Sequence, residues 1–207
     1  MKREKQVRTP KQQRSLEKAA LIKKAALELF SDKGYFKTTT NEIAKHAGLS
    51  IGTIYSYYKD KLDIYEELVK DHYTAAAEKA DMEHIPLNGS AYETMRGLIH
   101  MTWQSHYVNT AFQKEMAALS SQSDELRAVE QKYRDSMAPV IAAFLENHKE
   151  FYRVTDYQTA SLLITTSLEA VIHEAVFFPN DYDQEAIIRE LTDMFCAYLI
   201  KPEFLSC

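Results

Sequence analysis

The 207-residue chain has little of what interrupts or cross-links a polypeptide, with five Gly, five Pro and two Cys. So few Gly and Pro exclude a many-stranded sheet with frequent turns and favour long helices. Cys196 lies in a helical pattern and Cys207 is the last residue, which excludes a disulfide framework. The apolar fraction of 45% and the charged fraction of 27% are ordinary for a soluble globular protein, and with so few turn residues we expect it to be all-α, with a sizeable core.

Long uncharged apolar runs are also missing. The start, MKREKQVRTP, has no apolar centre, so we expect no secretory signal. The most apolar stretch, residues 160–178, contains Glu169, His173 and Glu174, which argues against a membrane span. The chain also lacks the GxSxG, P-loop, GxGxxG and CxxC motifs. We therefore expect a cytoplasmic protein that is not an enzyme and has no cofactor.

The net charge of −5 conceals an uneven distribution. Residues 1–61 carry 14 Lys or Arg and 6 Asp or Glu, whereas residues 62–207 carry 11 and 24. A basic head on an acidic body is typical of a polyanion-binding module, although runs of charge are also ordinary solvated surface.

Residues 38–61, TTTNEIAKHAGLSIGTIYSYYKDK, predict two short helices separated by a glycine-centred turn. Thr39 or Thr40 can cap the first helix through its side-chain oxygen. Gly48 allows the left-handed turn that ends this helix. Ser50 then caps the second helix. This arrangement predicts a helix-turn-helix.

The second of these helices, residues 51–57, is the predicted recognition helix. Ile54 and Tyr58 fall on its inner face. Small and hydroxyl-bearing residues that suit close approach to a DNA groove fall on its outer face: Gly52, Thr53, Ser56 and Tyr57. Lys59 and Lys61 follow directly, so nucleic acid is the favoured partner of the basic head.

The remaining patterns divide the chain into four parts. We expect a basic flexible arm over 1–15, which either reaches a DNA groove or has no specific contact. A helix-turn-helix domain over 16–61 begins with a helix ended by Gly34, and Asp60 caps a connecting helix over 62–83. The rest, 84–207, begins with the linker HIPLNGS and forms a second helical domain.

Within the second domain we expect helices over about 90–108 and 111–119 and a loop over 120–124. A long helix over 124–148 is expected to be kinked at Pro139. The last two helices, 156–177 and 184–200, are too apolar for easy coverage within one monomer. We predict that they form a two-fold four-helix bundle through Leu168, Val171, Ile172, Ala175, Ile188, Leu191, Phe195 and Tyr198. The alternative is that both helices belong to the core of one chain.

Over about residues 20–68 the sequence resembles the TetR family of bacterial transcriptional regulators. The residues that match its pattern are Ile22, Ala25, Ala26, Leu29, Phe30, Gly34, Thr38, Thr39, Ile43, Ala44, Ala47, Gly48, Ser50, Gly52, Thr53, Tyr55, Tyr57, Lys61 and Leu62. Tyr58 departs mildly, because the family commonly has Phe there. Beyond residue 70 the resemblance is architectural, and it implies a variable helical domain that binds a small effector and dimerises through its last two long helices.

The resemblance implies that Thr40, Tyr55 and Lys61 contact the DNA backbone, which positions the protein without reading sequence. Ile51, Gly52, Thr53, Ser56 and Tyr57 would face base edges, and the predicted DNA-binding set also includes Asn41 and Ser50. Because no Arg, Asn or Gln lies on this face, we expect site choice to depend on DNA shape and dimer spacing. The alternative for Tyr55 is a core aromatic that supports the domain.

The predicted effector pocket gathers aromatic and sulfur-containing side chains of the second domain: Trp103, Tyr107, Phe112, Tyr133, Met137, Phe144, His173 and Phe177. Such side chains at helical spacing are also typical of an ordinary core. An apolar cavity would suit a hydrophobic or aromatic effector. His173 four residues after Glu169 could hold a metal, but no second such pair is present, so we expect no metal site.

Together these patterns predict a homodimeric, ligand-responsive repressor that binds a palindromic DNA operator and is released by a small, mostly apolar effector. The alternative is a helical protein–protein interaction module that has the fold but does not regulate through DNA. The operator, the regulated genes and the identity of the effector stay open.

Overall fold

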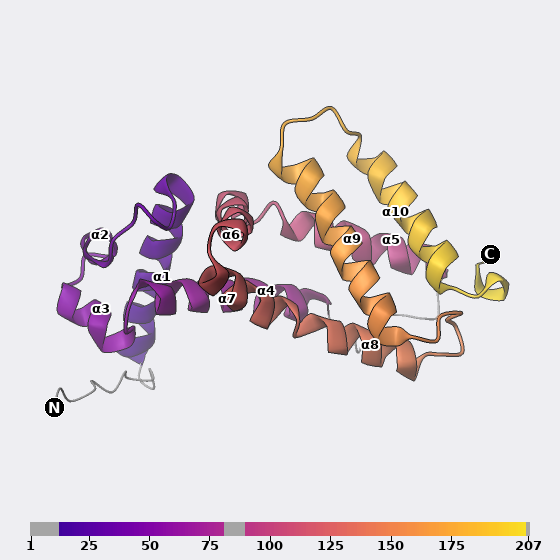
Figure 1. Ribbon diagram of the computed structural model, residues 1–207, viewed down its shortest axis with the longest axis horizontal. Helices are drawn as coiled ribbons and strands as arrows, with labels where there is room; N and C mark the ends of the chain where they lie inside the picture. The colour runs from indigo at the N-terminus through magenta and orange to yellow at the C-terminus, as the bar shows by residue number, and fades with distance from the viewer. Residues whose placement is uncertain (1–12, 81–89, 206–207) are drawn as a thin grey trace. The chain divides into compact units, whose positions relative to one another are not determined.

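The computed structural model describes residues 13–80 and 90–205, and within these ranges it consists of helices without strands (Figure 1). These residues divide into two compact units. Unit 1 comprises residues up to His72 together with Ala111–Gln131, and unit 2 comprises Tyr73–Thr110 and the residues from Lys132 onwards. The helices are α1 (Gln13–Lys33), α2 (Thr40–His46), α3 (Ile51–Tyr57), α4 (Lys61–Ala80), α5 (Ala91–Ser105), α6 (Thr110–Gln122), α7 (Asp124–Arg134), α8 (Met137–Asn147), α9 (Tyr157–Phe177) and α10 (Gln184–Leu199).

The helix-turn-helix of unit 1 begins and ends where its capping residues predict. Thr39 is the N-cap of α2 and shares a capping box with Glu42. Ser50 is the N-cap of α3, and its Oγ accepts a hydrogen bond from Thr53 N at 3.2 Å. Gly34 and Gly48 have φ of +87° and +67°, a conformation that costs glycine little and other residues more. Asp60 Oδ1 accepts from Asp63 N at 3.0 Å, as expected for the cap of α4.

The core of unit 1 joins α1 to α4 and also includes α6 and α7. Four aromatic rings contact one another in series, from Phe30 through Tyr35 and Tyr65 to Phe112, with centroids 5.3, 5.3 and 6.1 Å apart. Tyr65 has no exposed surface. Further buried side chains come from every helix of the unit: Ile22, Ala26, Ile43, Ile54, Ile64, Met116, Leu119 and Leu126. Residues 111–131 therefore complete the core around the helix-turn-helix, which the sequence patterns did not predict.

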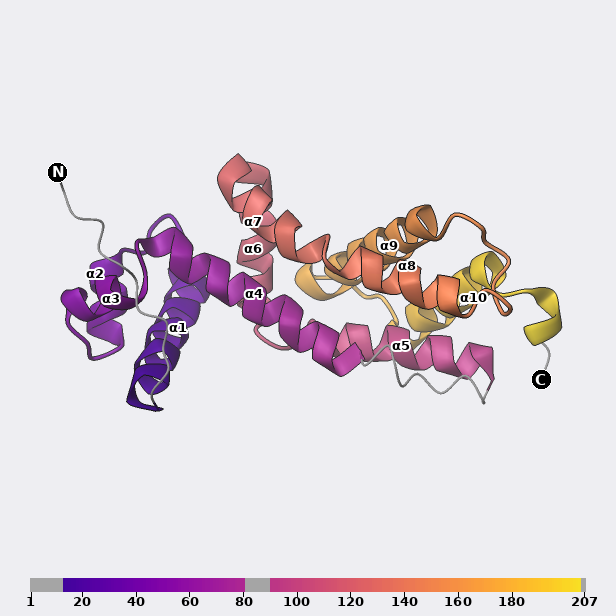
Figure 2. The same ribbon diagram turned by 90° about the horizontal axis from the view of Figure 1, so that it is seen from below.

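Unit 2 pairs α5 with α10 and α8 with α9, and α9 and α10 follow each other as an antiparallel pair (Figures 1 and 2). Its core is apolar and draws on all four helices. The chain after α10 lies against the loop before α9. Tyr152 and Ile200 form an antiparallel bridge, and the Phe151 and Phe204 rings are 5.0 Å apart.

The prediction of one long helix over 124–148 is wrong, because the structure has two helices there, α7 and α8. The interruption falls at residues 135–136, and Pro139 lies in the first turn of α8. A proline ring clashes with the carbonyl four residues earlier, here that of Asp135, and has no N–H to offer it. The helix therefore breaks ahead of the proline, where the sequence analysis expected a bend.

Two other boundaries differ from expectation. The helix expected to reach residue 108 ends at Ser105, because His106, Tyr107 and Val108 bond three residues back, and Asn109 has a φ of +56°. The loop expected over 120–124 is largely helical, since α6 continues to Gln122. Most of the expected arm and linker, residues 1–12 and 84–89, lie outside the described residues. By length and composition α9 alone among the described helices is long and apolar enough to cross a membrane.

Candidate nucleic-acid interface

The predicted recognition helix α3 has a clear inner and outer side. Ile54 is completely buried and Tyr58 is 6% exposed, as expected. Tyr55 is 42% exposed, so the alternative that it is a core aromatic is wrong. None of the residues of the predicted DNA-binding set is buried in unit 1: Thr40, Asn41, Ser50, Ile51, Gly52, Thr53, Tyr55, Ser56, Tyr57 and Lys61. The structure thus gathers all of them on or beside an accessible surface around α2, α3 and the start of α4.

Two hydroxyl pairs connect α3 to the helices beside it. The Tyr55 hydroxyl lies 3.1 Å from Thr40 Oγ1 in the first turn of α2. The Tyr57 hydroxyl lies 2.9 Å from Ser15 Oγ in the first turn of α1. The Thr40–Tyr55 pair places two hydroxyls side by side on an exposed surface, where one donates to the other and the remaining O–H can donate to a phosphate oxygen. Ser15 was not among the predicted site residues, since a serine near a helix start carries no sequence signal for a partner in α3.

The rest of the outer face of α3 is small and neutral. Ser50 Oγ lies 2.9 Å from Thr53 Oγ1, and Ser56 Oγ donates to Thr53 O at 2.7 Å. An added Cβ at Gly52 would meet only Ser50 Oγ, at 3.8 Å, which is ordinary van der Waals contact. Glycine is thus required there neither by backbone conformation nor by packing inside the protein.

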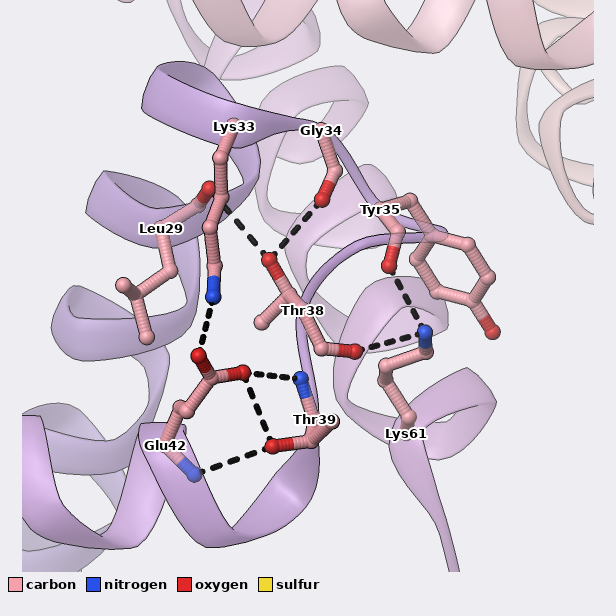
Figure 3. Close-up of polar contacts among 8 residues, drawn as sticks. All are labelled: Leu29, Lys33, Gly34, Tyr35, Thr38, Thr39, Glu42 and Lys61. Atoms are coloured by element: carbon pink, nitrogen blue, oxygen red, sulfur yellow. Dashed lines mark hydrogen bonds and ion pairs between the residues drawn. The ribbon is translucent and has the colours of Figure 1, made fainter.

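Lys61 differs from the role that the resemblance implies. Its ammonium donates to the Tyr35 and Thr38 carbonyls at 2.6 and 2.8 Å and lies 4.1 Å from the centroid of the Tyr35 ring (Figure 3). Partial burial lowers the pKa of this ammonium. Two of its three N–H donors therefore hold the turn between α1 and α2. A phosphate contact by Lys61 stays a prediction.

Replacing Lys61 by Met should therefore destabilise the fold, because the backbone carbonyls of Tyr35 and Thr38 each lose a hydrogen bond from a charged donor. We expect the free energy of unfolding to fall by about 1–3 kcal/mol. Urea unfolding followed by circular dichroism measures this change. Lys59→Met is the matched control, because the exposed Lys59 ammonium has no partner within the described residues. Equal stability of the two variants would contradict the structural role of Lys61.

A second polar cluster connects the end of α1 to the start of α2. The Glu42 carboxylate accepts from Thr39 N at 2.9 Å and from Thr39 Oγ1 at 2.8 Å, and it pairs with the Lys33 ammonium (Figure 3). Thr38, which is almost fully buried, donates through Oγ1 to Gly34 O at 2.8 Å. The bonds from Lys33, and next those from Thr39, lower the pKa of Glu42 to about 2. This cluster orients α2, and with it Thr40.

The lowered pKa of Glu42 predicts how stability depends on pH. A carboxyl group that ionises more readily in the folded chain stabilises it above the unfolded pKa, near 4.5, and this stabilisation is lost as the pH falls towards 2. The difference in unfolding free energy between the native chain and Glu42→Gln should therefore be constant near neutral pH and shrink progressively below about pH 5. Urea unfolding at a series of pH values checks this.

Glu146→Gln provides the control, because the Glu146 carboxylate is exposed and has no partner in the described part of the chain. A Glu42→Gln difference that stays constant down to about pH 2 would contradict the assigned network.

One further contact at the helix-turn-helix comes from far along the sequence. Glu115 of α6 accepts from Tyr35 N at 2.6 Å through Oε1, and the same oxygen lies 3.0 Å from the position of a Cβ at Gly34. A separate bond holds the end of α3, where the Tyr58 hydroxyl donates to Glu67 of α4 at 2.5 Å. Glu115 was not among the predicted residues, because no local pattern connects positions 80 residues apart.

The predicted effector residues fall in both units. Phe112 belongs to unit 1, where its ring packs on Tyr65, and the other seven belong to unit 2, so an effector pocket that includes Phe112 stays a prediction. In unit 2, Trp103 is buried and donates through Nε1 to the Tyr107 hydroxyl at 3.2 Å, whereas Tyr107 itself is mostly exposed. The remaining predicted residues of unit 2 are Tyr133, Met137, Phe144, His173 and Phe177, of which Phe177 is buried and the others are partly buried.

His106, which was not predicted, brings α5 and α9 together. Its ring lies 5.2 Å from that of His173 and 6.3 Å from that of Phe177, and His173 stacks on Phe177 at 4.5 Å. His106 is 7% exposed, and this burial lowers its pKa. Its Nδ1 lies 2.8 Å from Thr102 O. Within the described ranges no three His, Cys, Asp or Glu side chains are close enough to share a metal ion.

The predicted dimer residues need a correction. Ile172, Ile188, Leu191 and Phe195 are at most 5% exposed and belong to the core of their own chain, so they cannot meet a second copy. Leu168, Val171 and Ala175 are partly buried against the same core. Of the predicted set Tyr198 is exposed. The apolar side chains that α9 and α10 do present to solvent are Leu162, Leu163, Met194 and Tyr198.

Comparison with known proteins agrees with this architecture. The family model for bacterial regulatory proteins of the tetR family matches residues 22–68, and that for tetracycline repressor-like C-terminal domains matches residues 92–199. The fatty acid metabolism regulator protein of Bacillus subtilis (strain 168) is 30% identical over 180 residues, which cover 82% of this chain and 89% of the relative.

Solved structures share the fold at lower sequence identity. The fatty acid degradation regulator FadR of Bacillus halodurans superposes with a TM-score of 0.71 and 20% identity, over 90% of this chain and 96% of that one. Salmonella enterica GusR gives 0.75 and 16% identity, over 89% and 96%. None of these comparisons favours the alternative of an interaction module without DNA regulation. The chain belongs to the TetR family of bacterial regulatory proteins and is a ligand-responsive, DNA-binding transcriptional regulator.

Proposed function

We propose that the protein is a homodimeric, cytoplasmic repressor that binds a palindromic operator and leaves it when a small, mostly apolar effector binds unit 2. The observation that supports DNA reading most directly is the outer face of α3. The side chains of Gly52, Thr53 and Ser56 are small, so the helix backbone can come close to a base-pair edge. Such a helix fits into a major groove, and two copies read half-sites about 34–36 Å apart. Thr methyl groups contact thymine methyls, and the hydroxyls bond to either donors or acceptors on base edges.

Neutral side chains on this face give little base discrimination through paired hydrogen bonds. We infer that the operator is recognised in part by groove shape and by half-site spacing. The Thr40–Tyr55 hydroxyl pair supports a backbone contact at the edge of the groove, because hydroxyls from two helices lie 3.1 Å apart there. The surplus of basic residues in 1–61 supplies the attraction to phosphates.

Dimerisation is proposed through the apolar side chains that α9 and α10 leave exposed. Leu162 and Leu163 of α9 are 59% and 50% exposed, and neighbouring exposed apolar side chains mark an interaction surface. Two copies of α9 and α10 would bury Leu162, Leu163, Met194 and Tyr198 in a four-helix bundle. The two-fold axis of such a bundle matches the symmetry of a palindrome.

The effector is proposed to be a molecule with a fatty acyl chain. The 30% identical relative is named as a regulator of fatty acid metabolism. The side chains of α5, α8 and α9 in the core of unit 2 are apolar or aromatic, and the His106 and His173 rings offer a weakly polar group beside Phe177. Such a mixture suits a ligand that is apolar along most of its length.

Fluorescence anisotropy with labelled DNA tests the proposal in two steps. Duplexes selected by the protein from a random pool should bind with an affinity that falls steeply with salt, because phosphate contacts release counterions. Fatty acids and acyl thioesters of graded chain length are then added. The effective compounds should weaken DNA binding about 5- to 150-fold. Absence of salt-dependent binding to any duplex would refute DNA regulation, and DNA binding unaffected by every acyl compound would refute the effector class alone.

A further inference from the structure

The first turn of α1 holds a side chain of the recognition helix. Ser15 Oγ and the Tyr57 hydroxyl lie 2.9 Å apart in a partly buried position, although 42 residues separate them in sequence. Tyr57 is the last residue of α3, where the helix already turns into the extended Tyr58. Its side chain is partly buried, and the hydrogen bond to Ser15 restrains the orientation of the ring.

Several serine hydroxyls of the described residues bond within their own helix, and Ser161, which does reach another helix, donates to a backbone carbonyl, Ala138 O of α8, at 2.8 Å. The hydroxyls of Ser56, Ser105 and Ser121 donate to carbonyls three residues earlier in their own helices, at 2.7, 2.6 and 2.7 Å. Such bonds are made within one helix and do not hold a side chain of another helix. Ser15 instead directs its hydroxyl to another helix and to one side chain of the predicted DNA-reading set.

We propose that Ser15 is a positioning residue for sequence recognition, which holds the Tyr57 ring in the orientation that contacts base edges. The inference rests on the proposed DNA-reading role of α3 and extends the reading apparatus to α1. A tyrosine held in one orientation loses less conformational freedom on binding, and its ring meets the same base step in each complex. Without the bond, Tyr57 samples several rotamers and discriminates less between bases.

Experiment can distinguish the proposed positioning role of Ser15 from a direct contact between Ser15 and a DNA phosphate. Ser15 carries no charge, so its loss should leave the dependence of affinity on salt unchanged. A residue that only positions a base-reading side chain alters preference at particular base pairs, whereas a phosphate contact alters affinity for all sequences alike. Sequence preference is therefore the readout that a merely structural role for Ser15 would not move.

The experiment selects duplexes from a random-sequence pool with the native protein, Ser15→Ala, Tyr57→Phe and the double variant, and sequences the bound fractions. Ser15→Ala and Tyr57→Phe should lose preference at the same base positions. Each should bind the natively selected duplex about two- to tenfold more weakly, as expected for one neutral hydrogen bond. The double variant should be no weaker than either single one, because both changes remove the same bond.

Two further variants control for folding and for the loss of a hydroxyl. Ser121→Ala removes an exposed serine hydroxyl of α6 that bonds within its own helix, and it should leave selection unchanged. Ser15→Thr keeps a hydroxyl at position 15 and should restore the native preference. Thermal unfolding of every variant shows that the domain is intact.

A Ser15→Ala variant that selects the native sequences with native affinity would overturn the proposal, and so would equal weakening for selected and random duplexes. Additive losses in the double variant would also overturn it, since the two residues would then act separately. Failure of the native protein to select any duplex is a different result, because it contradicts the proposed function itself.

Discussion

Replacing Gly52 by Ala is expected to weaken operator binding about ten- to a hundredfold while making the protein more stable. Inside the chain an added methyl group at Gly52 meets nothing closer than Ser50 Oγ, at 3.8 Å. Glycine within a helix is less stable than alanine by about 0.5–1 kcal/mol, so the fold gains from the change. On the outer face of α3, the same methyl group would have to fit between the helix and the groove, and overpacking of a close contact costs about 1–3 kcal/mol.

Gly97→Ala is the matched control for this prediction. Gly97 is an exposed glycine of α5, and an added Cβ would have no neighbour within 4 Å. It should give the same gain in unfolding free energy without a change in DNA affinity. Anisotropy with selected duplexes and urea unfolding measure both quantities. Native DNA affinity in Gly52→Ala would mean that α3 does not approach the groove at this point.

Replacing Leu163 by Glu should convert the protein to a monomer and reduce operator affinity at least about a hundredfold. Leu163 lies on α9 and is 50% exposed, so a charged side chain there is tolerated within one chain. In a bundle of two copies the carboxylate would be buried without a partner, which strongly opposes association. A monomer holds one half-site at a time and loses the factor of about 10²–10⁴ that linkage of two sites supplies.

Val140→Glu is the control, because Val140 of α8 is 46% exposed and lies outside the proposed dimer surface. Sedimentation velocity gives the mass of each variant, and anisotropy gives its DNA affinity. A Leu163→Glu protein that stays dimeric would place the dimer surface elsewhere. A monomer that keeps full operator affinity would instead contradict the paired half-sites.

The helix-turn-helix could be predicted almost residue by residue because its signals are local. Side chains of Thr39, Ser50 and Asp60 satisfy backbone N–H groups within a few residues, and Gly48 marks its turn by a backbone conformation that few other residues adopt. These interactions depend on neighbours in sequence, so the sequence alone reveals them.

The faces of α9 and α10 could not be assigned in the same way. A helix that is apolar on nearly all sides has no periodicity to show which side faces inward. Ile172 and Phe195 were therefore expected at the dimer surface, whereas both are buried in the core of their own chain. Contacts between distant segments left no pattern either. Glu115 with Tyr35, and Ser15 with Tyr57, connect residues that only the folded chain brings together.

The inclusion of residues 111–131 in unit 1 limits how this regulator can be recombined with its relatives. A hybrid made by a single fusion after His72 would retain Tyr65 and Tyr35 but receive foreign side chains in place of Phe112 and Glu115. A transplant that keeps the unit whole needs junctions after His72, Thr110 and Gln131. Engineered biosensors that borrow the operator preference of this protein should therefore be designed with a discontinuous graft.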